Sequence, residues 1–347
     1  MQKQSHLLVV ALFALALPAQ ALLRHTGAGD VLTSTRPAKK AVPTELFEVE
    51  KVIDGDTIHI MRNGKLEKLR LLSVDTEEKF SANTSGTKGP TVFGEECALW
   101  AQGFFAGLAQ DGAKPKVGLA FPNGHEQYDF HGRLLCSIVL ADGTDYNLMI
   151  VEMGKSPYFT KYGFSETDHA AFVSAQKNAR NAQRGIWDPK TNQPATPNTP
   201  SAKRPYETLV PWWDARGEAV RAFRDARAKE PTKVCDTDDP AALREAALRG
   251  EVVRCFGELG KIKDDPNGGM SVNFRASKKD QAFVVFISKE KKDAFKALDL
   301  TGATEEFRQN YMWLETKVTA DPKGDFKAEC DDPSLWKRAG PEPVMPK

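Results

Sequence analysis

Acidic residues gather in two neighbouring motifs near the start of the chain. Asp54 and Asp56 flank a glycine in the stretch VIDGDT, and Asp75, Thr76 and Glu78 follow in SVDTEE. Carboxylates held close together repel one another unless a cation neutralises them, and hard cations prefer oxygen ligands. The two motifs can therefore form a metal site. An acidic turn is, by itself, more often only a turn, and Asp54 also fits a turn-capping role.

Two arginines extend this set toward phosphate chemistry. Arg70 lies between the two acidic motifs, and Arg133 occurs in the later stretch DFHGRLL. Guanidinium groups form forked hydrogen bonds with phosphate oxygens, a metal ion polarises the phosphate, and a carboxylate such as Glu78 can activate water. The combination suits hydrolysis of a phosphodiester bond. A surface network of salt bridges among the same residues is the alternative interpretation.

Short runs rich in Val, Ile and Leu must position these side chains. Three runs follow Leu46, and an Asn63-Gly64 turn between the last two predicts a tight hairpin. Strict alternation places Arg70 and Asp75 on opposite faces of the third strand, so we expect a bend or bulge between them. Residues 79–93 are rich in Gly, Ser and Thr and predict a mobile loop. Helices are expected at 95–108, 146–153 and 166–184, and further strands at 115–120 and 133–140, which together predict a small β-barrel with packed helices.

The order of these motifs resembles the staphylococcal nuclease (thermonuclease) family. The resemblance covers residues 46–188 and runs through VIDGDT, LRLLSVDTEE, FGEECALWAQ, DFHGRLLCSIVLADG, YNLMIVEMG and AQKNARNAQRGIWD. It implies an OB-fold barrel with helices and Ca²⁺-dependent hydrolysis of phosphodiester bonds in DNA and RNA. A non-catalytic protein that binds nucleic acid or calcium is the alternative, and the complete set of motif residues favours the enzyme.

By position, the resemblance assigns a metal-binding role to four residues. It implies that Asp56 and Asp75 are direct calcium ligands and that Thr76 adds its backbone carbonyl oxygen. It implies that Asp54 is an outer carboxylate near the metal, although a plain turn-capping role remains open for this residue.

The resemblance also assigns the catalytic roles. It implies that Glu78 is the general base or positions the attacking water, and that Arg70 and Arg133 stabilise the pentacovalent transition state. Two departures matter: Glu77 stands where the family commonly has proline, and Phe130-His131 replaces a Lys-Tyr pair. Glu77 is expected to add a charge beside the site and to free the backbone.

Three further residues are candidates for substrate binding. His131 can replace part of the missing phosphate contact when it is protonated. Tyr158 and Tyr162, in SPYFTKYGF, are candidates for stacking on a nucleic-acid base.

The first 21 residues have the pattern of a signal peptide. Lys3 precedes an apolar run from Leu7 to Leu17, and Ala19-Gln20-Ala21 has the small-residue form of a cleavage site. Cleavage predicts a secreted or periplasmic protein without stable membrane association. An uncleaved membrane anchor is the alternative.

Polar stretches rich in Pro and Thr predict linkers at 22–44 and 189–205. They delimit a nuclease-like domain at 45–188 and a C-terminal α+β domain at 206–340. In the second domain, helices are expected at 207–228, 240–248 and 289–298, and the number of strand patterns suggests an OB-like barrel. The fold class expected for the whole chain is mainly β with helices. No motif of the second domain indicates a ligand or a protein partner.

Charge and cysteine content give weaker guidance. The net charge of the chain is +1, and acidic residues outnumber basic ones within 45–188. Attraction of phosphates by bulk charge is therefore excluded, and weak binding to long polymers is expected without metal. Five cysteines fit no zinc-ligand spacing, and a Cys235–Cys330 disulfide is one interpretation of their positions.

Overall fold

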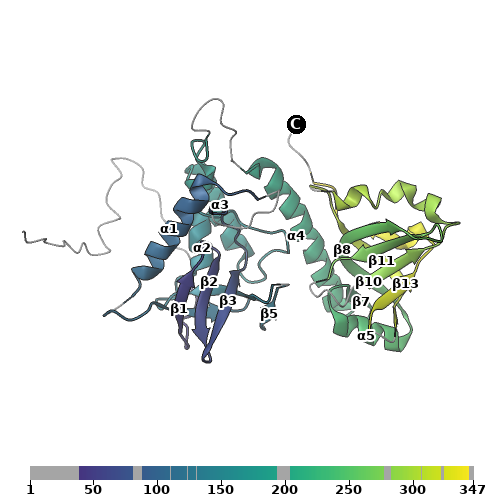
Figure 1. Ribbon diagram of the computed structural model, residues 1–347, viewed down its shortest axis with the longest axis horizontal. Coiled ribbons are helices and arrows are strands. Elements are labelled where there is room, and N and C mark those ends of the chain that lie inside the picture. Colours follow the sequence, from purple (N-terminus) through teal and green to yellow (C-terminus); the bar gives the residue numbers. More distant parts are fainter. Residues whose placement is uncertain are drawn as a thin grey trace, which may run out of the picture. The chain divides into compact units, whose positions relative to one another are not determined.

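Two β-sheets, each with its own helices, build the described part of the chain (Figure 1). The computed structural model describes residues 39–80, 88–109, 111–122, 124–129, 131–193, 204–276, 283–305, 307–321 and 324–343. The predicted signal peptide at 1–21, most of the 22–44 linker and positions 194–203 of the second linker lie outside these residues.

The first sheet closes on itself as a barrel, as the sequence predicts. Its strands are β1 (Phe47–Val52), β2 (Thr57–Arg62), β3 (Lys65–Leu71), β4 (Lys116–Ala120) and β6 (Leu134–Val139). The hydrogen-bonded order is β3-β2-β1-β4-β6, and β3 closes the ring by pairing with β6 in parallel, Leu69 opposite Leu134. A short strand β5 (Gln127–Tyr128) pairs with the outer part of β6.

The predicted hairpin between β2 and β3 is confirmed. Arg62 pairs with Lys65, and the two residues between them have positive φ angles, 50° at Asn63 and 72° at Gly64. This conformation matches the right-handed twist of the strands and favours Asn-Gly. The hairpin fixes the register that carries Thr57 opposite Arg70 at its far end.

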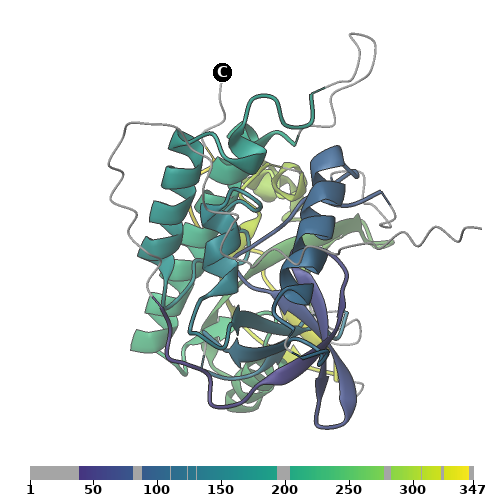
Figure 2. The same cartoon turned by 90° about the vertical axis from the view of Figure 1, so that its left-hand side faces the viewer.

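Three helices accompany the barrel: α1 (Val92–Ala106), α2 (Tyr146–Glu152) and α3 (His169–Asn181). The blue helix α1 lies beside the purple strands of the barrel (Figure 2). It begins earlier than predicted because the Thr91 hydroxyl accepts a hydrogen bond from the Gly94 backbone N–H at 2.9 Å. The predicted loop 79–93 is therefore wrong at its end, where a capped helix begins; its middle, 81–87, lies outside the described residues.

The C-terminal part contains an open mixed sheet rather than the expected barrel. Its hydrogen-bonded order is β12-β13-β10-β9-β8-β11-β14, and β7 pairs with β8. These strands are β7 (Val234–Asp236), β8 (Val252–Asp264), β9 (Met270–Phe274), β10 (Phe283–Ile287), β11 (Tyr311–Lys317), β12 (Thr319–Ala320), β13 (Phe326–Glu329) and β14 (Trp336–Arg338). The sequence patterns gave most strand positions, but closure depends on pairing between distant strands, which periodicity does not determine.

Two of the three expected C-terminal helices form as α-helices: α4 (Tyr206–Lys229) and α5 (Pro240–Arg249). The third, expected at 289–298, is instead a 3₁₀ helix, η3 (Lys292–Leu298). Helix α4 joins two hydrophobic clusters. Its first turns pack with Phe93 and Ile186, and its later turns pack with Phe256 and Tyr311. It therefore connects the nuclease-like part to the C-terminal sheet.

All five cysteines are buried free thiols. The considered Cys235–Cys330 disulfide is therefore wrong, and Cys235 lies opposite Cys255 on the paired strands β7 and β8. Among the described residues, no helix combines the length and the apolar character that a membrane crossing needs.

Candidate active site

The first acidic motif forms a tight turn that directs Asp56 inward. The Asp56 backbone N–H donates to Asp54 Oδ1 at 3.1 Å, which is the Asx-type turn considered for Asp54. Asp56 is only 3% exposed, and its Oδ2 accepts a hydrogen bond from the Thr76 backbone N–H at 2.8 Å. A Cβ on Gly55 would lie 2.6 Å from the Thr76 side chain. Glycine is therefore required where the two acidic motifs touch.

Arg70 and Asp75 converge, although not through a bulge. Strand β3 ends at Leu71, and Ser73, with a φ of 64°, turns the chain so that Asp75 faces back toward Arg70. Arg70 Nη2 lies 2.9 Å from Asp75 Oδ1, and its Nη1 forms an ion pair with Asp56. The two carboxylates from separate motifs thus share one guanidinium group.

Asp75 is held by three cationic side chains. Its Oδ1 contacts Arg70 and the Lys88 ammonium group, the latter at 2.8 Å, and its Oδ2 contacts Arg204 Nη1 at 3.0 Å. Burial raises the pKa of the Asp75 carboxyl, but Lys88, Arg204 and Arg70 outweigh this effect and hold it well below its usual value. Burial likewise acts on Asp56, whose pKa is nevertheless lowered, chiefly by Arg70. Both carboxylates are therefore ionised.

Asp54 differs from these two residues. Burial, followed by the negative charge of Asp56, raises the pKa of the Asp54 carboxyl to about 7. Arg70 opposes this shift only weakly, because its ion pairs go to Asp56 and Asp75. Asp54 is thus a turn residue whose carboxyl keeps its proton up to near-neutral pH.

Glu78 lies at the edge of the cluster and is partly exposed. The Lys88 ammonium group lies 2.7 Å from Glu78 Oε1 and so links this carboxylate to Asp75. A Cβ on Gly94 would lie 2.1 Å from the Glu78 carbonyl oxygen, so helix α1 approaches the acidic loop through a glycine.

Glu77 places its charge beside the site, as expected, but from a buried position close to Arg204. It is 1% exposed, and its carboxylate accepts hydrogen bonds from the Tyr206 hydroxyl at 3.0 Å, the Thr91 hydroxyl at 2.5 Å and Asn192 Nδ2 at 2.5 Å. The expectation of a freed backbone is wrong, because these bonds fix the loop to α1 and to α4.

Arg133 does not contact the acidic cluster. Its Nε lies 2.7 Å from Asp129 Oδ2, and the Asp129 carboxylate also accepts from the backbone N–H of His131 at 2.9 Å. His131 is exposed. Both residues belong to the loop that leads into β6, and Arg133 is one position from Leu134, the partner of Leu69 on β3.

The two candidate tyrosines differ in exposure. Tyr158 is 2% exposed, its ring stacks on Phe172 at 4.9 Å between centroids, and its hydroxyl lies 3.0 Å from His169 Nδ1. It is therefore a core residue and does not present a ring face to a base. Tyr162 is 63% exposed and retains a surface suited to stacking.

Sequence reasoning missed Lys88 and Arg204. Lys88 falls in the Gly/Ser/Thr-rich segment and Arg204 in the Pro-rich segment, both of which read as connections. A basic residue in a connection carries no sequence signal for a distant carboxylate. Only a search for cations that could balance the acidic excess would have singled them out.

The residues of this cluster fit a hard cation. Two ionised carboxylates converge on one guanidinium, which shows that a positive group is accommodated between them. Within the described residues, no group of three or more His, Cys, Asp or Glu side chains is arranged to hold a metal. The protein thus offers two carboxylates and leaves further coordination to backbone, water or substrate oxygens.

Comparison with known proteins is decisive for the barrel region. Residues 68–189 match the family model described as staphylococcal nuclease homologue. The chain contains a staphylococcal nuclease family domain. The domain is thus of an endonuclease-like hydrolase family. The match begins after Asp54 and Asp56 and does not extend to Arg204 or the C-terminal sheet.

Relatives support the same assignment at modest identity. Endonuclease YhcR of Bacillus subtilis is 29% identical over 192 residues, which are 54% of this chain and 14% of that protein. An uncharacterised protein of Methanocaldococcus jannaschii is 29% identical over 154 residues, 42% of this chain and 72% of that protein. A protein of Escherichia coli O157:H7 named as an uncharacterised endonuclease is 27% identical over 139 residues, 40% of this chain and 74% of that protein.

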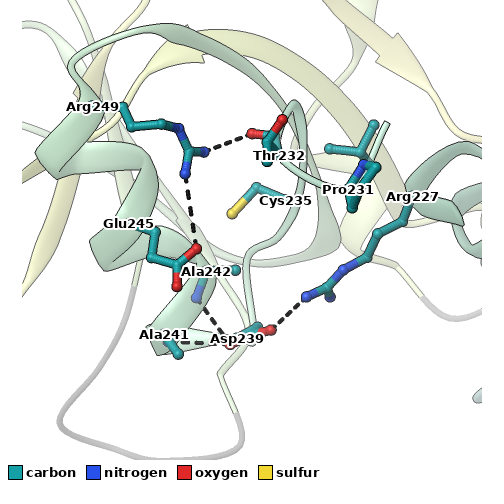
Figure 3. Close-up of a pocket in the computed structure, with 10 residues that line it drawn as sticks. Arg227, Pro231, Thr232, Cys235, Asp239, Ala241, Ala242, Glu245 and Arg249 are labelled. Carbon is teal, nitrogen blue, oxygen red and sulfur yellow. Dashed lines mark hydrogen bonds and ion pairs between the residues drawn. The ribbon is translucent and has the colours of Figure 1, made fainter. Parts of the chain in front are cut away.

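A small cavity of about 150 Å³ in the C-terminal part involves none of the cluster residues. Figure 3 shows Arg227 directed at Asp239, and Arg249 directed at Thr232 and Glu245. The charged groups that line this cavity are engaged with neighbouring protein atoms. Its arrangement is that of a structural junction.

Proposed function

We propose that the protein is a metal-dependent nuclease that hydrolyses phosphodiester bonds of DNA and RNA, with Ca²⁺ as the metal. The observation that carries this proposal is the convergence of Asp56 and Asp75 on a single guanidinium, with Glu78 linked to the same cluster through Lys88. Ionised carboxylates from two separate loops that converge on cationic groups supply the oxygen ligands that a hard cation prefers.

Asp56 and Asp75 would hold the cation, and the Thr76 backbone carbonyl would add an oxygen ligand. The metal would polarise a phosphate oxygen and offset the charge that develops in the transition state. Asp54 would remain outside direct contact, because its Oδ1 already accepts the Asp56 N–H in the turn.

Glu78 would orient the attacking water or accept its proton, which its partial exposure and its place at the edge of the cluster allow. Arg70 and Arg133 would bind the phosphate oxygens. Arg70 would exchange its carboxylate partners for phosphate, and Arg133 would exchange Asp129. His131 would add a phosphate contact when it is protonated, and Tyr162 would stack on a base.

A direct assay tests the function. The full chain is incubated with single-stranded DNA or RNA at mildly alkaline pH, either with Ca²⁺ or with a chelator. We expect degradation that requires Ca²⁺ and that falls by about 10²- to 10⁴-fold in Glu78→Gln. Lys155→Gln, in a residue whose ammonium group lies 4.6 Å from the centre of the Trp100 ring, is the control and is expected to retain activity.

Two results would contradict the proposal. Absence of Ca²⁺-dependent cleavage by the wild-type protein would favour the alternative of a non-catalytic nucleic-acid or calcium-binding protein. Near wild-type activity in Glu78→Gln would remove this residue from the mechanism.

The proposal extends to the fold of the barrel and to the location of the protein. The closed strand order β3-β2-β1-β4-β6 with one parallel pair supports an OB-fold assignment for the barrel. The apolar run and small-residue cleavage pattern of the first 21 residues support a secreted or periplasmic location. Detection of the chain lacking these residues outside the cytoplasm would test the second statement.

A further inference from the structure

Arg204 reaches the candidate metal site from outside the matched family segment. It stands just before α4, 129 positions from Asp75, and yet its Nη1 lies 3.0 Å from Asp75 Oδ2. Its side chain is only 8% exposed. An arginine from the second half of the chain is therefore part of the acidic cluster.

The position of Arg204 is fixed by the start of α4. The Tyr206 hydroxyl donates to Glu77 Oε1 at 3.0 Å, in the same acidic loop as Asp75. The Arg204 guanidinium lies 5.5 Å from the centre of the Tyr206 ring and 5.7 Å from that of Trp213. These contacts hold the segment against the loop, so that the ion pair is a built feature of the fold.

Hydrogen bonding of Arg204 is incomplete. Its Nε is buried and has no hydrogen-bond partner among the described residues. Arg216, on α4, shows the contrast: its Nε donates to the Lys161 carbonyl at 3.0 Å, and its two terminal nitrogens bond to Asn310 and Glu258. Buried donors are normally paired. The unpaired Nε indicates that Arg204 forms a further hydrogen bond when a ligand is bound.

A phosphate group is the ligand that this chemistry favours. Arg204 sits on Asp75, the carboxylate that would hold the metal, and guanidinium groups bind phosphate through forked hydrogen bonds. A divalent cation at Asp75 would repel the guanidinium, because like charges at such short range disfavour each other strongly. A phosphate bound at the metal would offer Arg204 a new anionic partner.

We propose that Arg204 is a third phosphate-binding arginine of the nuclease site, which rests on Asp75 before substrate binds and transfers to a substrate phosphate afterwards. This inference rests on the proposed nuclease function. It makes Arg204 both a competitor of the metal in the free protein and a contributor to substrate binding. Removal of Arg204 should therefore strengthen Ca²⁺ binding in the free protein and weaken the binding of nucleic acid.

The test uses full-length Arg204→Ala and Arg204→Lys. Calorimetry without nucleic acid measures Ca²⁺ affinity, and fluorescence anisotropy with a short single-stranded DNA measures substrate affinity in Ca²⁺, with Glu78→Gln as the common background to prevent cleavage. We expect Arg204→Ala to bind Ca²⁺ about three- to tenfold more tightly. It should bind the DNA about tenfold or more weakly, because a charged hydrogen bond is lost.

Arg204→Lys should keep near wild-type Ca²⁺ affinity and lie between the two proteins in DNA affinity, since lysine keeps the charge but loses the fork. Arg224→Ala is the matched control. Arg224 lies on α4, the helix that Arg204 precedes, but it binds the Phe164 carbonyl at 2.9 Å and Glu166 at 3.1 Å. Its removal should change neither affinity.

Opposite changes in the two affinities would support the inference. Weaker binding of both Ca²⁺ and DNA by Arg204→Ala would indicate a structural role and overturn it, as would unchanged DNA affinity. Failure of the proposed function is seen separately, as a wild-type protein that does not cleave nucleic acid in Ca²⁺. If the wild type cleaves and Arg204→Ala binds like it, only the present inference fails.

Discussion

Two clusters of buried charge lie along α4, and they are built differently. At Asp75, three cations meet an acidic group that also includes Asp54, Asp56 and Glu78. At Glu258, a single carboxylate receives Arg216 Nη2 and Asn310 Nδ2, each at 3.0 Å, and Arg275 at 3.4 Å. In the second cluster every guanidinium nitrogen of Arg216 has a partner, whereas in the first the Arg204 Nε has none among the described residues. Completeness of hydrogen bonding therefore separates a structural cluster from a site that awaits ligands.

The largest expected effect is on the acidic cluster. Asp75→Asn removes one of the two carboxylates proposed to hold the metal, so we expect Ca²⁺-dependent cleavage to fall by about 10³-fold or more. Calorimetry should show weakened Ca²⁺ binding in the same variant. Wild-type Ca²⁺ affinity in Asp75→Asn would break the comparison, because the cluster would then be structural like that at Glu258.

Removal of Arg216 should lower the stability of the protein and leave Ca²⁺ binding almost unchanged. Arg216→Ala removes a fully buried guanidinium and leaves the largely buried Glu258 carboxylate without its main partner, so we expect the free energy of unfolding to fall by about 3–5 kcal/mol. Urea denaturation measures this change. At temperatures where the variant is folded, Ca²⁺ affinity should stay close to that of the wild type, and a large loss of Ca²⁺ affinity would show that the two clusters are not independent.

A third prediction concerns pH. Burial raises the pKa of Asp236, on β7, to about 6, above its usual value of 3.8. The folded state thus binds this proton more tightly than the unfolded state, and the contribution of Asp236 to the free energy of unfolding should decrease as the pH rises from about 4 to about 6. Asp236→Asn keeps an acceptor for the Asp238 N–H and removes the charge. It should gain about 2–3 kcal/mol over the wild type at pH 7 and almost nothing at pH 4.

Urea denaturation of both proteins at the two pH values checks this difference. An equal gain at both pH values would contradict the assignment of the effect to ionisation of Asp236.

The smallest expected effect is at the junction between the two clusters. Tyr206→Phe removes one of three hydrogen bonds to the buried Glu77 carboxylate, and we expect it to lower the free energy of unfolding by about 1–2 kcal/mol. Ca²⁺ affinity should change less than twofold. If the free energy of Ca²⁺ binding changed more than the free energy of unfolding, Glu77 would belong to the metal site.

The sequence was informative where local pattern and function coincide. Alternation and the Asn63-Gly64 turn predicted the β2–β3 hairpin, and motif order identified the barrel. Convergence of Arg70 and Asp75 was expected, but its means was not, because the positive φ of Ser73 has no strong sequence signal. The C-terminal barrel was wrongly expected, since strand count does not show which strands pair.

Side-chain partners across long separations were the least predictable features. Glu77 was expected to free the backbone, yet it is buried and fixed because Tyr206 and Asn192 reach it from more than a hundred positions away. Arg204 reads as part of a linker for the same reason. Burial of a charge depends on tertiary contacts that only the folded chain supplies.

The contact between Arg204 and Asp75 has a consequence for the order in which the protein is made. The acidic loop leaves the ribosome long before Arg204 is synthesised, so a nascent barrel would hold its carboxylates without this counter-charge. The start of α4 would complete the cluster only when the later half of the chain is available. Exchange of residues 45–188 as an independent module would therefore transfer an acidic loop whose Glu77 and Asp75 have each lost a partner. A barrel domain with all partners of its acidic loop therefore extends at least to Tyr206.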